Sequence, residues 1–314
     1  MLLPFELIAL LVGLVLGSFL NVCIARLPNH ESIATPRSHC PRCLATIHWY
    51  DNIPILSWIL LRARCRACKA TIPWRYPLVE LGVGLWAVLI TRLYIITADH
   101  ASGLATQGIS ITVCTFSMPT LIQMTSVFIL GFLLIGLMVM DWQTHTLPDA
   151  FTLTGTGIGF LLACARSAFL GPHEDEVVLH GRNPITSAGS TQDPGNMVLT
   201  GPEHYIMSRL LAILLAAGLI LAIRALYQAI RKQEGLGLGD VKLMAMIAAF
   251  LGFAPAMLGL FVGVLLCAFY AASLLAQKKA DSKTAVPLGT FLCIGGLFAA
   301  LIAAPVLSWY TSFF

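Results

Sequence analysis

Long apolar segments recur along this chain, and they constrain its fold more than any other feature. A helix needs about 20 apolar residues to cross the hydrocarbon core of a bilayer. Hydrophobic residues make up 58% of the 314 residues and charged residues only 11%, against about a quarter charged in ordinary soluble domains. The sequence therefore predicts an all-α polytopic membrane protein. Eight transmembrane helices are expected, at about 5–22, 78–97, 121–140, 150–169, 206–227, 241–254, 256–276 and 286–309.

The sixth and seventh of these segments are the least well separated, because Gly252 and Pro255 stand between two short apolar runs. The first segment has neither a basic n-region nor a small-residue cleavage site. It is expected to stay as the first transmembrane helix, 1–22.

The distribution of Lys and Arg predicts the orientation. Segments 23–77, 224–242 and 277–285 carry 15 of the 19 basic residues. Cytoplasmic loops are enriched in Lys and Arg, so these segments are expected in the cytoplasm and both termini outside. An even number of helices fits this alternation. The other four basic residues are Arg92, Arg166, Arg182 and Arg209.

Three parts are expected along the chain: the first helix, a cytoplasmic loop domain at 23–77, and a membrane core at 78–314. Within the core, the outer loops at about 98–120 and 170–205 show neither helical nor strand periodicity. They are expected to be loosely ordered connectors.

Two aspartates lie at the ends of predicted helices. Asp141 follows directly on one apolar run, and Asp240 begins another. Ionisable groups at the edge of a membrane span are costly and are candidates for function. Asp240 could instead be a helix N-cap. Asp141 is harder to explain by helix stability, because a carboxylate at a helix C-terminus meets the unfavourable end of the dipole. The predicted topology places both on the cytoplasmic face, as a carboxylate pair requires.

Two carboxylates brought close together share one proton. One can then take a proton from water while the other protonates the carbonyl or the leaving amine, which is aspartic-protease chemistry. The helix dipoles favour Asp240 as the base and Asp141 as the acid. Gly235, Gly237 and Gly239 would let a substrate backbone approach Asp240, or they could serve loop flexibility or helix packing. Lys242 could pair with a carboxylate or mark the membrane interface.

A basic loop between the first two helices contains two CxxC pairs, Cys40–Cys43 and Cys65–Cys68, separated by 21 residues. This spacing fits a tetrahedral four-thiolate zinc site. Disulfides are disfavoured in the cytoplasm, and redox CxxC motifs usually occur singly, near a βαβ pattern. Four thiolates leave no open coordination position, so the zinc would be structural.

The ordered motifs resemble those of the type IV prepilin peptidases, bacterial leader peptidase/N-methyltransferases related to other GxGD intramembrane aspartyl proteases. The resemblance runs over nearly the whole chain. Besides the two CxxC pairs, it rests on Gly17-Ser18-Phe19-Leu20-Asn21-Val22, Arg26-Leu27-Pro28, Asn52-Ile53-Pro54, Arg75-Tyr76-Pro77-Leu78-Val79-Glu80, Asp141 before Leu147-Pro148-Asp149, and Gly237-Leu238-Gly239-Asp240-Val241-Lys242-Leu243.

The resemblance implies cleavage of prepilins and pseudopilins on the cytoplasmic side of the bacterial inner membrane, after a short basic leader. It also implies N-methylation of the new N-terminus with S-adenosylmethionine, in support of type IV pilus assembly or type II secretion. Asp141 and Asp240 would be catalytic, and the four cysteines would bind zinc. Glu80 is a weak candidate for the methyl-donor site and could equally be a polar anchor at a helix start. The expected partners are the substrates and the bilayer, not nucleic acid.

One position and one motif depart from the family pattern. Many relatives carry a second acidic residue where this chain has Gln143, and the late motif reads Val286-Pro287-Leu288-Gly289-Thr290-Phe291-Leu292. The alternative from another class is a proton-coupled transporter using membrane carboxylates, which predicts mid-span charges and related halves. A third possibility is an assembly protein that docks partners through the zinc loop and has inert aspartates.

Overall fold

The computed structural model describes residues 3–35, 37–101, 118–169, 202–232, 237–277 and 286–313. Within these residues the protein is all-helical, as predicted, and β-structure is limited to the isolated bridges His39–Thr46 and Arg64–Thr71. The chain forms two compact units. The first contains Met1–Phe116 and Val127–Ala150, and the second contains Ser117–Ser126 and Phe151–Phe314.

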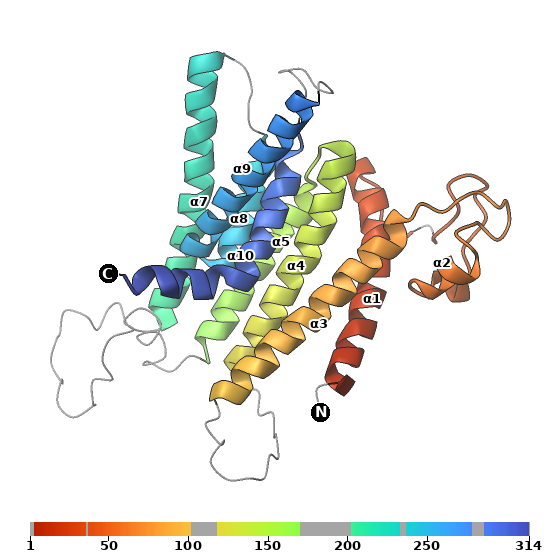
Figure 1. Ribbon diagram of the computed structural model, residues 1–314, viewed down its shortest axis with the longest axis horizontal. Coiled ribbons are helices and arrows are strands. Elements are labelled where there is room, and N and C mark those ends of the chain that lie inside the picture. The colour runs from red at the N-terminus through yellow and green to blue at the C-terminus, as the bar shows by residue number, and fades with distance from the viewer. Residues whose placement is uncertain are drawn as a thin grey trace, which may run out of the picture. The chain divides into compact units, whose positions relative to one another are not determined.

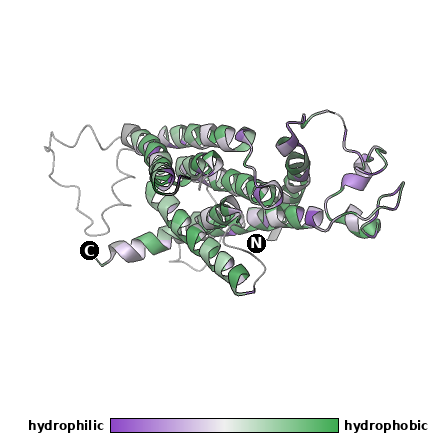
Figure 2. Ribbon diagram, turned by 90° about the horizontal axis from the view of Figure 1, so that it is seen from above, coloured by the Kyte–Doolittle hydropathy of each residue, from purple (hydrophilic) through white to green (hydrophobic). Residues whose placement is uncertain are grey.

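The first unit is built on two packed helices, α1 (Leu3–Arg26) and α3 (Arg75–Ala101), which lie side by side in Figure 1. The connection between them contains two short 3₁₀ helices, η1 (Leu27–Asn29) and η2 (Trp49–Asn52), and one turn and a half of helix, α2 (Leu56–Leu60). Figure 2 shows the long helices as mostly hydrophobic and the connecting segment as richer in hydrophilic residues.

Small residues bring α1 and α3 into backbone contact. A Cβ added at Gly13 would lie 2.7 Å from Gly84 Cα, and one added at Gly17 would lie 2.6 Å from Glu80 Cα. The four-residue spacing of Gly13 and Gly17 puts both on one face of α1, the arrangement of small-xxx-small membrane helix pairs. Glycine on α1 therefore fixes how closely the start of α3 approaches it.

Helix α4 (Met118–Thr144) contributes to both units, with the residues from Val127 onward in the first. Gly131 makes room there for the indole of Trp86, because an added Cβ would lie 2.0 Å from the Trp86 ring nitrogen. That nitrogen donates a 3.3 Å hydrogen bond to the carbonyl of Val127. The end of α4 that carries Asp141 thus belongs to the same unit as α1 and α3.

The second unit is organised around α8 (Leu238–Leu251). Its other helices are α5 (Asp149–Ser167), α7 (Pro202–Arg231), α9 (Phe253–Ala276) and α10 (Leu288–Thr311), and α7, α9 and α10 all contact α8. Most of α8 is buried, including every residue from Met246 to Phe250. A helix that is apolar on all sides is expected at the centre of a helical assembly.

Gly252 separates α8 from α9. Its φ of 91° lies in the left-handed region, which favours glycine, and Arg209 occupies the space where a side chain would stand. The sequence-based separation of two helices at this point is confirmed. In α5, Gly159 allows close packing, since a Cβ added there would lie 2.7 Å from the Phe250 ring. A Cβ added at Gly157 would meet no atom within 4 Å.

The predicted count of eight transmembrane helices is not confirmed. Every predicted segment forms a helix, but only six described helices are long and apolar enough to cross a membrane: Pro4–Asn29, Arg75–Tyr94, Met118–Thr144, Tyr205–Ile230, Phe253–Ala276 and Leu288–Tyr310. The two that fall short are α5, with 19 residues, and α8, with 14. At 1.5 Å per residue α8 is about 21 Å long, less than the roughly 30 Å hydrocarbon core.

Most of the two predicted outer loops, 98–120 and 170–205, lies outside the described residues. So do Gly235 and the basic residues Lys278, Lys279 and Lys283. The predictions made for them stay predictions.

Candidate functional site

Asp141 lies in the last turn of α4, at the helix end that the sequence indicated. The helix stops there because His145 adopts a left-handed conformation, with a φ of 51°, and its N–H donates to the Asp141 carbonyl at 2.9 Å. The Asp141 residue is only 5% exposed. A carboxylate at the negative end of a helix dipole does not stabilise the helix, so the functional role expected of Asp141 stays a prediction.

Asp240 lies in the first turn of α8 and is 8% exposed. The N-cap interpretation of this residue is wrong, because Gly237 occupies the N-cap position and Asp240 is the third residue of the helix. At that position a carboxylate still faces the positive end of the dipole. Asp141 belongs to the first compact unit and Asp240 to the second, so the pairing of the two carboxylates stays a prediction.

Gly237 precedes α8 with backbone angles that do not require glycine. Gly237 has φ −74° and ψ 150°, an extended conformation open to any residue. A Cβ added there would meet nothing closer than the Asp240 Oδ2 at 3.7 Å. Gly239 is the second residue of α8, and Lys242 is half-buried one turn further on. Neither φ nor internal packing requires glycine at position 237.

Gln143 ties the end of α4 to the start of α3. Its side-chain oxygen accepts a short hydrogen bond from Arg75 Nη1, and the Arg75 guanidinium also lies over the Tyr76 ring, 5.1 Å from its centroid. Arg75 and Tyr76 begin the Arg-Tyr-Pro motif. The Gln143 amide oxygen thus accepts a hydrogen bond from Arg75 at the position, two residues after Asp141, where the family pattern has an acidic residue.

The four motif cysteines come together in the connection between α1 and α3. Their sulfur atoms all lie within 4.8 Å of one another, and Cys40 Sγ is 3.8 Å from Cys68 Sγ. Four sulfurs placed about 2.3 Å from a central ion form a tetrahedron with edges of about 3.8 Å. The cluster can hold a metal ion, as the sequence predicted.

Each CxxC pair forms the same turn. In the first, Cys40 N–H donates to the Ala45 carbonyl and Leu44 N–H to the Cys40 carbonyl, at 2.9 Å each. In the second, Cys65 N–H donates to the Ala70 carbonyl at 2.8 Å, and Lys69 N–H to the Cys65 carbonyl at 3.0 Å. Leu44 and Lys69 both adopt a φ of 57°. The local repeat Cys-x-x-Cys-x-Ala-Thr-Ile, at 40–47 and 65–72, could have been noticed in the sequence and was missed.

The electrostatics of the cluster favour thiolate at Cys40. Backbone N–H groups of Cys43 and Arg42 point at its sulfur and lower its pKa to about 6. Metal binding needs thiolates, so one ligand is already ionised at neutral pH. The donor set, four sulfurs that all lie within 4.8 Å of one another, suits zinc and leaves no open position for a substrate.

An ion pair links the four-cysteine cluster to the rest of the connection, and Glu80 links the connection to α3. Arg66, next to Cys65, forms a bidentate pair with Asp51, with N–O distances of 2.8 and 2.6 Å. Glu80, in α3, is 8% exposed, and its Oε2 accepts the backbone N–H of Ile55 at 2.7 Å. Ile55 has a φ of 59°, an outlier for a β-branched residue. Glu80 therefore fixes a strained turn, which agrees with the interpretation of Glu80 as a polar anchor.

Glu80 also lines a cavity of about 630 Å³ between the cysteine-containing connection and the adjoining ends of α1 and α3. Acidic, basic and aromatic side chains all face it, among them Asp51, Arg66 and Trp58. Nothing in the sequence predicted this cavity, because its walls come from segments that are brought together only by the fold.

Comparison with known proteins identifies the family. Residues 11–94 match the Bacterial Peptidase A24 N-terminal domain, and residues 196–272 match the Type IV leader peptidase family. A type 4 prepilin-like proteins leader peptide-processing enzyme of Escherichia coli is 31% identical over 310 residues, covering 93% of this chain and 92% of that protein. The chain belongs to the type IV leader peptidase family.

Two further members of this peptidase family are similar. The prepilin leader peptidase/N-methyltransferase of Myxococcus xanthus is 39% identical over 157 residues, which is 50% of this chain and 46% of that protein. The enzyme of the same name from Stutzerimonas stutzeri is 27% identical and covers 99% of this chain and 95% of its own length. No solved structure matches.

The two family matches divide the leader peptidase features between them. The first contains the four cysteines and Glu80, and the second contains Gly237 and Asp240. Asp141 lies between the matched ranges. Its assignment therefore rests on its own position, at a helix end and buried, and on the motif resemblance.

Proposed function

We propose that this protein removes the leader peptide of type IV prepilins and pseudopilins and methylates the new N-terminus. The observation that carries the proposal is the full-length similarity to a leader peptide-processing enzyme, combined with two buried aspartates at helix ends. The Stutzerimonas and Myxococcus relatives bear both activities in their names. No observation favours the proton-coupled transporter.

Catalysis is assigned to Asp141 and Asp240. The two carboxylates would meet at the cytoplasmic face and hold one proton and one water between them. Asp240, at a positive helix end, would take a proton from the water, which attacks the peptide carbonyl. Asp141, at a negative helix end, would hand its proton to the leaving amine. An extended substrate would lie against Gly237, where the structure leaves open space and requires no glycine for its own sake.

The topology proposed for this chemistry has eight crossings, with α5 and α8 completing the set of six long helices, and with segments 23–77, 224–242 and 277–285 in the cytoplasm. The charge distribution supports it, since 15 of 19 basic residues fall in these segments. Residues 23–77 would form a separate module on the membrane core 78–314.

Zinc is the metal proposed for the four cysteines, in a structural role. S-adenosylmethionine is the proposed methyl donor and would supply an electrophilic methyl group. Direct binding of the donor by Glu80 stays a prediction, because the described contacts of its carboxylate serve to position Ile55.

The test is cleavage of a purified prepilin by the wild type, Asp141→Asn and Asp240→Asn. Each variant should lose about 10²–10⁴-fold in kcat, the contribution of positioned acid–base groups. Asp281→Asn removes a carboxylate from another predicted cytoplasmic segment and should cut normally. No cleavage by the wild type would refute the peptidase assignment, and it would leave the assembly protein with inert aspartates. Normal cleavage by either active-site variant would remove that residue from the pair.

A further inference from the structure

Two arginines enclose one tyrosine in the second unit. Arg166 lies in the last turn of α5, and Tyr205 and Arg209 lie in the first two turns of α7. Arg166 Nη1 and Arg209 Nη2 each donate to the Tyr205 hydroxyl oxygen at 2.9 Å. The guanidinium carbons lie 5.4 and 4.9 Å from the Tyr205 ring centroid, within cation–π range. Two positive charges therefore share one neutral hydroxyl group, and Arg209 Nη1 also donates to the Phe250 carbonyl near the end of α8 at 3.3 Å.

Among the described residues neither arginine forms an ion pair with a carboxylate, unlike Arg66 with Asp51 and Arg92 with Glu6. The Arg166 and Arg209 nitrogens that donate to the Tyr205 oxygen lie within about 6 Å of each other, so the two guanidinium charges repel. The start of α7 adds the positive end of a helix dipole. By contrast Arg92, on the same predicted side of the membrane, has a bidentate partner in Glu6.

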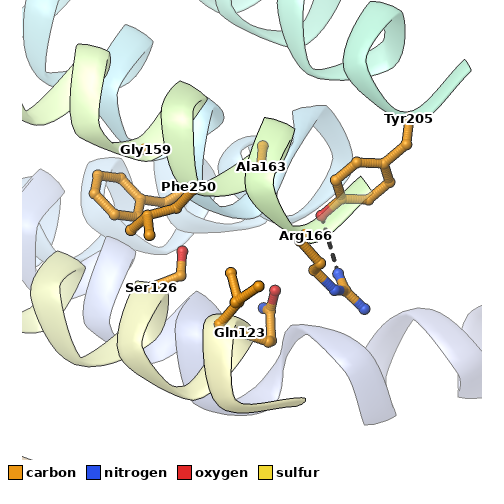
Figure 3. Close-up of a pocket in the computed structure, with 9 residues that line it drawn as sticks. Gln123, Ser126, Gly159, Ala163, Arg166, Tyr205 and Phe250 are labelled. Carbon is orange, nitrogen blue, oxygen red and sulfur yellow. Dashed lines mark hydrogen bonds between the residues drawn. The ribbon is translucent and has the colours of Figure 1, made fainter. Parts of the chain in front are cut away.

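One donor of this arginine–tyrosine cluster is buried and unsatisfied. Arg166 Nε has no hydrogen-bond partner in the part of the chain that the structure describes. The recess beside it, lined by Gln123, Ser126 and the ring of Phe250, is too narrow for a water molecule (Figure 3). Buried donors without partners are rare and costly. An acceptor for Nε is therefore expected from outside the described residues.

We propose that Arg166, Tyr205 and Arg209 bind the phosphate group of an anionic lipid in the outer leaflet. A phosphate diester offers several oxygens to the fixed donor fork of a guanidinium. The location fits a headgroup, because Tyr205 and Arg209 lie in the first two turns of α7, at the helix end that the Lys and Arg distribution predicts to be outside. Outer-side arginines are disfavoured by the positive-inside rule, so a local counter-ion gives a reason for the pair. This site is separate from the proposed peptidase chemistry.

The test uses the purified full-length protein in detergent, titrated with phosphatidylglycerol while thermal unfolding and lipid adducts in native mass spectrometry are followed. The wild type should bind the lipid and unfold at a higher temperature. The Arg166→Gln/Arg209→Gln variant should bind it about tenfold more weakly. Arg231→Gln, at the other end of α7, is the matched control and should bind as the wild type does. Prepilin cleavage by each variant verifies its fold.

Three comparisons identify the ligand. Phosphatidylcholine tests headgroup charge, and inorganic phosphate tests whether a soluble anion suffices; an equal effect of either would overturn the assignment to an anionic lipid. The Glu174→Gln/Asp175→Asn/Glu176→Gln variant tests the loop between the two helices. If phosphatidylglycerol has no effect on the wild type and this variant unfolds like the arginine variant, the loop is the counter-ion and the proposal is wrong.

Gln123→Glu covers the case in which the double arginine variant does not fold. It places a carboxylate in the recess beside Arg166 while keeping both cations. It should weaken phosphatidylglycerol binding by competing for the same donors. Unchanged binding by Gln123→Glu would contradict the site.

Discussion

Removing the metal from the four-cysteine cluster is expected to unfold the segment from Arg37 to Trp74 and to leave the long helices in place. Within that segment only Cys40 and Ser57 are buried. Burying one apolar side chain contributes about 1.5–3 kcal/mol, whereas a structural zinc site contributes roughly 10–16 kcal/mol in small peptides. No other interaction in the segment approaches the contribution of the metal site, and the solvent-exposed Asp51–Arg66 ion pair adds little.

The assay compares trypsin digestion of the purified protein before and after chelation, with metal content measured in parallel. Arg62, Arg64 and Lys69 are exposed, but cleavage requires local unfolding of the backbone around them. Chelation should speed cleavage at these sites by orders of magnitude, and zinc should restore protection. Cys68→Ser should resemble the chelated protein, and Cys164→Ser, which removes a half-buried thiol in α5, should resemble the wild type.

Two results would refute the reasoning. One is a purified, active protein that carries no metal at any stage. The other is full loss of one metal ion per chain without any change in the rate of cleavage between Arg62 and Lys69, which would show that the segment has another source of stability.

Two more predictions follow from single contacts. Arg66 holds the pKa of Asp51 below its usual value, so the pair stabilises the fold above the unfolded-state pKa of about 3.9 and is lost as pH falls through the lower folded-state value. Asp51→Asn should therefore lower the unfolding temperature at pH 7, and the difference from wild type should shrink as the pH falls below about 3.9; a difference that does not change with pH would argue against the ion pair. Gly17→Val should destabilise the protein by about 1–3 kcal/mol, because its Cβ would stand 2.6 Å from Glu80 Cα. The control Gly82→Val meets no atom within 4 Å and should be near neutral in thermal unfolding; equal losses at both positions would point to helix propensity instead.

Much of the local structure was determined by the sequence alone. Apolar length predicted the helices, because a bilayer requires every backbone polar group to be satisfied within a segment. The CxxC spacing predicted the four-sulfur cluster, because each pair closes its own turn and only two turns have to meet. The break at Gly252 was visible because a left-handed φ excludes most other residues.

The tertiary structure decided what depends on neighbours distant in sequence. A short apolar run does not reveal whether lipid or protein covers it, so the central position of α8 became evident only from the packed helices. Gly17 and Glu80 belong to sequence motifs, but only the packed helices show that they lie against each other where α1 contacts α3. Arg166 of α5 and Arg209 of α7 both contact Tyr205. The hydrophobic periodicity of the sequence does not predict which sides of these two helices face each other. Local patterns fix a residue's conformation and its element, whereas burial and partners are properties of the assembled chain.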